Sequence, residues 1–180
     1  MNFSLVIIFI FIFVNKINAM DLLDNKNNLN TFHKEWEFLT DEVMGGVSSG
    51  KLDLIGEENV NFIRLSGKVS TENNGGFIQI RSNFNLDKQF EGIKIKVRGI
   101  PSDYYVHIRT GFLLLPWQYY SGKFTVTNNW SEIKIPFDDF KKSNFYQPSK
   151  FNASDIKSIG FVAFGKNFNA QLDLIEAELF

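Results

Sequence analysis

The sequence has no cysteine among its 180 residues, and His33 and His107 are its only histidines. The lack of cysteine excludes a thiol nucleophile, a disulfide framework and any metal site with cysteine ligands. A phosphate-binding loop and a His-Glu-x-x-His pair are also missing. We therefore predict a protein without enzymatic activity, catalytic residues, metal site or cofactor. Its dispersed carboxylates leave a glycosidase-like acid pair as the remaining enzymatic alternative.

The sequence also lacks an excess of charge of either sign. It contains 19 Lys and Arg against 20 Asp and Glu, so its formal net charge is −1 at pH 7. Nucleic-acid-binding domains usually present a basic face with a clear excess of positive charge. We predict that the protein has no nucleic-acid partner.

Long apolar runs are scarce, and the only uninterrupted one is LVIIFIFIFV at residues 5–14. As a helix it would cover about 15 Å, roughly half of a bilayer core. It suits the core of a signal peptide, with Ile17-Asn18-Ala19 as the cleavage site. We predict a signal peptide at 1–19 and an exported or periplasmic protein. The alternatives are an uncleaved short anchor and a start at Met20, which would leave the protein at the inner membrane or in the cytoplasm.

Helical periodicity is nearly absent from the remaining chain, where short runs alternate between apolar and polar residues. Turn signals such as Asn73-Asn74-Gly75-Gly76 separate the runs. Only 138–142 and 153–157 look helical. This pattern predicts an all-β fold, an antiparallel sandwich or barrel. The polar, Asn-rich segment 20–35 is predicted to be a flexible N-terminal arm, and 36–180 the folded domain. The predicted strands are 36–38, 50–55, 62–69, 77–81, 93–97, 104–108, 124–126, 133–135, 159–163 and 171–175.

The segment from Asp41 to Gly50, DEVMGGVSSG, combines unusual backbone freedom with short polar side chains. Gly45 and Gly46 allow positive φ or a close approach of another chain, while Asp41 and Ser48 can bind local amides. Met44 would be an adaptable apolar contact at the tip. This segment is either a conformationally demanding turn that closes the sandwich or a contact for a partner or ligand.

Two further groups of residues are candidates for binding. Arg81 and Arg109 lie on predicted strands, where they either pair with acids on the same face or line a groove for an anionic or polyhydroxyl ligand. The stretch FLLLPWQYY at 112–120 contains Leu114, Trp117 and Tyr119. It is either buried core or an exposed loop for a hydrophobic partner or a membrane surface, and its aromatic residues could also stack on a sugar ring.

Several motifs occur together in one order. They are Trp36, Asp41-x-Val-Met-Gly-Gly-x-Ser-x-Gly50, Phe62-x-x-x-x-Gly67-x-Val-Ser70, Asn73-Asn-Gly-Gly-Phe77-x-x-Ile80-Arg81, Val97-Arg-Gly99, Tyr105-x-x-x-Arg109-Thr110, Trp130, Ile135-Pro-Phe137-x-x-Phe140 and Ile159-Gly160-Phe161. From Trp36 to Phe180 the chain resembles the complex I intermediate-associated protein 30 family, an assembly-factor domain of NADH:ubiquinone oxidoreductase. The resemblance implies a galactose-binding-like jelly-roll β-sandwich without catalytic residues. The family-like positions are Asp41, Met44, Gly45, Gly46, Ser48, Gly75, Gly76, Arg81 and Arg109.

Two functional hypotheses follow. The first, implied by the resemblance, is a chaperone-like binding module that assists assembly of a respiratory membrane complex. It expects Leu114 and Trp117 to be accessible to solvent, and an exported protein would act on membrane-arm subunits from outside. The second is an exported module that binds a carbohydrate or another small ligand, which expects an aromatic platform beside Arg or Asp side chains.

Overall fold

The structure is a computed structural model that describes residues 19–57 and 60–180. The hydrophobic run of the predicted signal peptide therefore lies outside the described residues. Among those residues, no helix is both long and apolar enough to cross a membrane.

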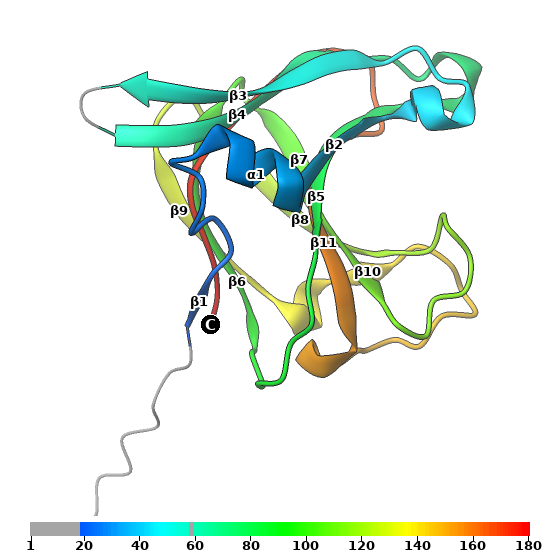
Figure 1. Cartoon of the computed structure of the whole chain (residues 1–180). Coiled ribbons are helices and arrows are strands. Elements are labelled where there is room, and N and C mark those ends of the chain that lie inside the picture. Colours follow the sequence, from blue (N-terminus) through cyan, green and yellow to red (C-terminus); the bar gives the residue numbers. More distant parts are fainter. Residues whose placement is uncertain (1–18, 58–59) are drawn as a thin grey trace, which may run out of the picture.

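Two antiparallel sheets pack face to face, so the predicted all-β sandwich is confirmed (Figure 1). Sheet A has the strand order β3-β4-β12-β6-β9, and β1 also pairs with β12. It comprises β1 (Met20–Asp21), β3 (Ser49–Glu57), β4 (Val60–Val69), β6 (Gly92–Gly99), β9 (Ser131–Pro136) and β12 (Phe168–Leu179).

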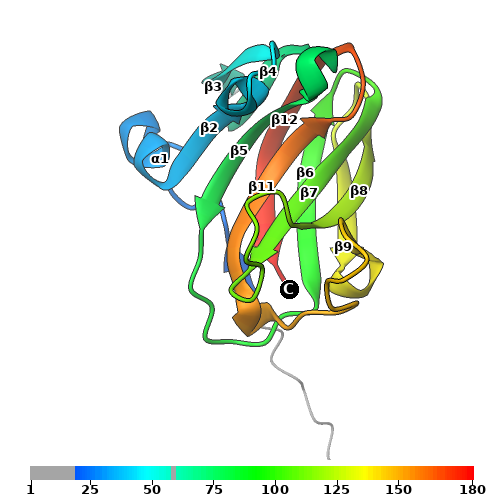
Figure 2. The same ribbon diagram turned by 90° about the vertical axis from the view of Figure 1, so that its right-hand side faces the viewer.

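Sheet B has the order β10-β8-β7-β11-β5-β2, and its outer face is turned toward the viewer in Figure 2. It comprises β2 (Trp36–Thr40), β5 (Phe77–Asn83), β7 (Ser102–Thr110), β8 (Tyr120–Val126), β10 (Lys141–Lys142) and β11 (Ile156–Phe164). The remaining elements are the helix α1 (Leu29–Glu35) and the 3₁₀ turns η1 (Asp41–Met44), η2 (Glu72–Asn74), η3 (Phe137–Asp139) and η4 (Ala153–Asp155).

The alternating sequence pattern explains which face of each strand is buried. In β6, Ile93, Ile95 and Val97 are buried in the core. The intervening residues of β6, Lys94, Lys96 and Arg98, point outward because successive side chains of a strand face opposite ways. The same alternation in β7 leaves Tyr105, His107 and Arg109 on the outer face of sheet B.

The segment 20–35 differs from the flexible arm that the sequence predicted. Its first two residues pair with the end of β12, and Leu22 and Leu23 are buried. The Asn28 side chain accepts a hydrogen bond from the amide of Thr31 and so caps α1. Phe32 then stacks on Trp36 with ring centroids 5.8 Å apart. The seven-residue helix is too short to show a helical period, which is why its polar composition suggested an arm.

The two segments that looked helical are shorter than predicted. Over 138–142, the turn η3 is followed by the two-residue strand β10, which pairs with β8. Over 153–157, η4 passes into β11 after one turn.

Candidate functional site

The Asp41 carboxylate joins the two glycine-rich turns that the sequence singled out. It is fully buried and accepts hydrogen bonds from the Ser48 amide at 2.8 Å, from the Ser48 hydroxyl and from the Gly76 amide. The Ser48 hydroxyl oxygen in turn accepts a hydrogen bond from the amide of Ser70. We call residues 41–48 and 70–77 together the Asp41 junction.

The glycines of the Asp41 junction are required for two different reasons. A Cβ atom at Gly46 or Gly75 would lie 2.3 Å from the Asp41 carboxyl group, so only glycine fits at these positions. Gly45 and Gly76 have φ values of 85° and 130°, which side chains rarely tolerate. The predicted conformationally demanding turn is therefore what the structure contains.

Asp41 is ionised in this environment. Burial by itself would raise its pKa, but the hydrogen bonds from Ser48, Gly76 and Phe77 together outweigh burial and lower the pKa of Asp41. The tip of the turn points outward, and Val43, Met44 and Val47 are exposed. Among the family-like positions of the Asp41 junction, Met44 presents a large exposed apolar side chain.

A second group of exposed apolar residues lies on two loops at the other end of sheet B. We call residues 111–119 and 143–150 the loop pair; both loops project beyond the sheets on the right of Figure 1. Leu114 is 89% exposed, Trp117 57% and Phe145 87%. Leu113 is buried beside them, so the stretch at 112–120 combines one core residue with an exposed apolar tip.

Polar side chains hold the loop pair in place. The Tyr119 carbonyl oxygen accepts hydrogen bonds from the Ser143 amide at 3.0 Å and from the side chain of Gln147 at 3.2 Å. Gln147 and Gln118 are both buried, and Gln118 accepts a hydrogen bond from the Leu115 amide at 2.8 Å. Loops that are fixed in this way present their apolar side chains in one defined arrangement.

Arg109 belongs to the same support rather than to an ion pair. Its guanidinium donates to the carbonyl oxygens of Leu115 and Pro116, at 3.2 Å and 3.0 Å. Burial and the nearby Arg81 lower the pKa of Arg109. Arg81 pairs with Glu37 at 2.9 Å. Of the two arginines, only Arg81 therefore forms the predicted ion pair with an acid on the same face.

On the outer face of sheet B, between the Asp41 junction and the loop pair, buried residues of β11 form a low surface that we call the floor. The central strand β11 turns Ser158, Gly160 and Val162 toward this face, and all are buried. Gly160 lies directly between Arg81 on β5 and His107 on β7. Glycine has no side chain, so the larger side chains of Arg81 and His107 flank this position, and the side chain of Gln79 packs over it.

Aromatic rings line one side of this floor. His107 stacks on Tyr119 with centroids 4.0 Å apart, and the ring of Phe164 meets His107 at 5.5 Å. Tyr105 packs against the ring of Phe164 at 6.0 Å. Burial lowers the pKa of His107 to about 3, so the imidazole is neutral. Among the described residues, its Nε2 has no hydrogen-bond partner.

The structure groups the predicted site residues into two sets with Arg81 between them. The family-like Asp, Ser and Gly residues meet at the Asp41 junction, and Arg109, Leu114, Trp117 and Tyr119 meet at the loop pair. Sequence reasoning missed Phe145 and Tyr146, although adjacent aromatic residues in a polar loop are the kind of signal that marked Trp117. It also missed Gln118 and Gln147, which carry no signal in a single sequence. Within the described part of the chain, no group of three acidic or histidine side chains is arranged to hold a metal ion.

Comparison with known proteins gave one family and several structures. The model of the complex I intermediate-associated protein 30 family matches residues 24–174. A search of the curated proteins found no match. A family 11 carbohydrate-binding module from Clostridium thermocellum, in complex with a β-1,3-1,4-mixed-linked tetrasaccharide, is similar with a TM-score of 0.68 and 16% identity, over 90% of this chain and 95% of that one.

A second structure supports the same fold. The family 11 carbohydrate-binding module of the cellulosomal cellulase Lic26A-Cel5E of Clostridium thermocellum has a TM-score of 0.65 and 15% identity, over 81% of this chain and 87% of that one. At these identities the likeness concerns the fold, the two-sheet sandwich of such modules.

Proposed function

The chain belongs to the complex I intermediate-associated protein 30 family, and from this premise we propose that it is a non-catalytic binding module for assembly of a respiratory membrane complex. Its partner would be a subunit of NADH:ubiquinone oxidoreductase or an intermediate in its assembly. The module would hold an apolar segment of that partner until the segment is buried in the complex.

The observation that carries this proposal is the exposed apolar tip of the loop pair. Burial of exposed apolar side chains by a partner would stabilise the complex by about 25 cal/mol for each Å² of apolar surface covered. Because buried glutamines and Arg109 fix the loops, a partner would not have to order them, and this ordering is a main cost of association. Trp and Tyr are also the residue types that most often dominate binding energy.

Capture of solubilised complex I subunits by the full chain tests the proposal. The double variant Leu114→Ser/Trp117→Ser should lose most of the captured subunits. The matched control is Val43→Ser/Met44→Ser, which removes equally exposed apolar groups from the Asp41 junction and should capture as the wild type does. Equal loss in both variants would indicate nonspecific stickiness, and equal capture by all three proteins would exclude the loop pair as the site.

We propose further that the leader at 1–19 exports the protein, so that it would meet membrane-arm subunits from outside. Cell fractionation followed by mass spectrometry of the terminal peptide tests this point. A chain that begins at Met20 in the exported fraction supports export. The same chain in the cytoplasm would instead indicate that translation starts at Met20, and would direct the search to the peripheral arm.

A second candidate function, carbohydrate binding, is favoured by the outer face of sheet B. There Gly160 and Ser158 leave a low floor between Arg81 and the rings of Tyr105 and His107. A sugar ring could lie on such a floor, with its apolar face on an aromatic ring and its hydroxyl groups at the polar side chains.

Thermal shift across a panel of glycans, including a β-1,3-1,4-mixed-linked glucan, tests the second candidate. A ligand at 100 times its Kd should stabilise the protein by about 2.7 kcal/mol. The shift should disappear in Tyr105→Ala and persist in Leu114→Ser/Trp117→Ser. A flat response across the panel would exclude carbohydrate binding at the tested concentrations.

A further inference from the structure

The outer face of sheet A contains a fully buried carboxylate between two arginines. Asp173 on β12 has no exposed side-chain surface. Its Oδ1 accepts from Arg64 Nε at 2.6 Å, and its Oδ2 accepts from Arg64 Nη2 at 2.7 Å and from Arg98 Nε at 3.1 Å. All acceptor positions that face the arginines are thus in use, and the carboxylate is shielded from solvent behind them.

Both guanidinium groups are held in fixed positions. Arg64 forms a bidentate pair with Asp173, the strongest geometry for an arginine and a carboxylate. Arg98 pairs with Asp173 and Glu57 and lies over the rings of Trp130 and Phe62, at 4.6 Å and 5.0 Å from their centroids. Their hydrogen bonds with carboxylates raise the pKa values of Arg64 and Arg98, so both stay charged.

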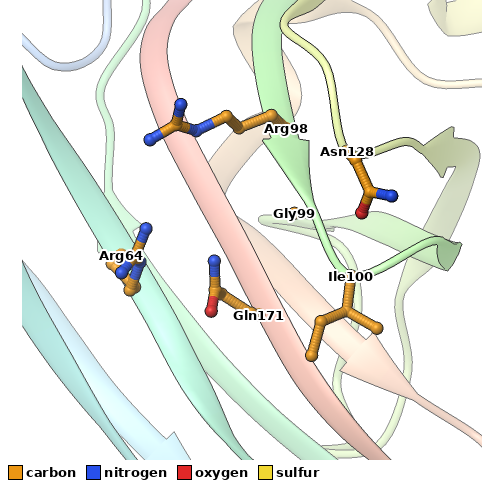
Figure 3. Close-up of a pocket in the computed structure, with 6 residues that line it drawn as sticks. All are labelled: Arg64, Arg98, Gly99, Ile100, Asn128 and Gln171. Atoms are coloured by element: carbon orange, nitrogen blue, oxygen red, sulfur yellow. The ribbon is translucent and has the colours of Figure 1, made fainter.

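A cavity of about 240 Å³ adjoins the two arginines on this face (Figure 3). In that view the side chain of Gln171 lies beside Arg64 and below Arg98, and Asn128 contributes a second amide from the turn before β9. The lining residues include two cations and no acid: Arg64, Arg98, Gly99, Ile100, Asn128 and Gln171.

Several hydrogen-bond donors of the residues that line the cavity have no acceptor in the described part of the chain. Among the described residues, neither Nη1 of Arg64 nor Nη1 of Arg98 has a hydrogen-bond partner, and the side-chain amides of Asn128 and Gln171 have none either. Asp173 and Glu57 balance the charges of the two arginines, so the hollow attracts an anion through its free guanidinium and amide donors, and charge-assisted hydrogen bonds are about twice as strong as neutral ones.

We propose that this cavity binds a single oxyanion, a phosphate or carboxylate group, on the outer face of sheet A. Drug-sized ligands usually occupy cavities of about 300–1,000 Å³, so a cavity of 240 Å³ suits one such group rather than a larger molecule. The oxyanion accepts from the free donors of Arg64 and Arg98, and Gln171 and Asn128 complete its shell. This site is separate from the loop pair, and its existence does not depend on the proposed assembly role.

Calorimetric titration of the full chain with sodium phosphate and with sodium acetate tests the site. Sodium chloride at equal ionic strength is the control for general salt effects. We expect binding with a Kd on the order of 1 mM, and perturbed Arg64 and Arg98 Nε–H signals in an NMR titration. Binding of phosphate alone assigns the group as phosphate, and binding of acetate as well assigns a general oxyanion site. Heat and signal changes no larger than those with chloride would refute the proposal.

Two variants of the same kind locate the site. Gln171→Glu puts a negative charge in the cavity without touching the pairs of Asp173, and should weaken phosphate binding about tenfold or more. Gln79→Glu makes the same change on the outer face of sheet B and should leave binding unchanged. If Gln171→Glu lowers the melting temperature, Asn128→Asp in its exposed turn replaces it. Wild-type affinity in the cavity variants would overturn the proposal.

Discussion

The Asp41 junction and the loop pair lie at opposite ends of sheet B, and both present apolar side chains to solvent. The junction is held by one buried, ionised carboxylate, and Gly46 and Gly75 lie so close to it that a side chain at either position would clash with it. The loop pair is held by neutral glutamines and by an arginine that binds backbone oxygens. The residues most characteristic of the family therefore mark a structural junction, while the most exposed apolar residues lie where no such motif occurs.

Substitution Asp41→Asn should have the largest effect on stability. Its amide group would place N–H donors against the amides of Ser48 and Gly76 and would remove the charge that those donors share. We expect the free energy of unfolding to fall by about 3–5 kcal/mol, measured by urea denaturation.

The control for this comparison is Asp138→Asn, which breaks an exposed ion pair with Lys150 and should cost less than about 1 kcal/mol. A loss of similar size in both variants would show that the Asp41 junction has no special structural role. Capture of the partner should be unchanged in the fraction of Asp41→Asn that remains folded.

Mild acid should affect the two regions differently. The pKa of His107 is lowered to about 3 in the folded protein, so between pH 6.5 and 3 the unfolded chain binds a proton that the folded chain excludes. Stability should therefore fall as the pH falls through this window, by a few kcal/mol at most. Asp41 also has a lowered pKa, and its contribution remains until the pH falls below about 4.

Urea denaturation at pH 7 and pH 5 measures this difference. His107→Phe keeps the ring stack with Tyr119 and should remove most of the loss between the two pH values. His33→Gln, at an exposed position of α1, should retain the loss. An unchanged pH dependence in His107→Phe would show that another group causes it.

Removal of a neutral support should have an intermediate effect. Gln147 accepts from the Asn144 amide at 2.8 Å and donates to the Tyr119 carbonyl oxygen, so Gln147→Ala leaves both groups without these bonds. We expect a loss of about 1–3 kcal/mol and faster hydrogen exchange at the Asn144 amide, with no change at Ser48. Faster exchange at both amides would show that the two regions are coupled.

The sequence predicted most of the fold because its strands have one buried face. Strict alternation at 93–97 and 104–108 determined which side chains enter the core, and the glycine pairs indicated the demanding turns. The packing of Leu22 and Leu23 was not predictable, since this segment pairs with β12 at the other end of the chain rather than with a neighbour in sequence. The charged site on sheet A was missed for the same reason: Arg64 and Asp173 are far apart in sequence and meet only through the pairing of β4 with β12.

Trp117→Ser should have the smallest effect on stability and the clearest effect on binding. More than half of the Trp117 side chain is in solvent, so its removal should change the free energy of unfolding by less than about 0.5 kcal/mol. The loop pair should keep its hydrogen bonds, because Arg109 and Gln118 bind the backbone around position 117 rather than the indole. If the variant loses its partner with an unchanged melting temperature, the exposed ring serves recognition. A loss of more than about 2 kcal/mol would instead make Trp117 a structural residue, and the contrast with the Asp41 junction would fail.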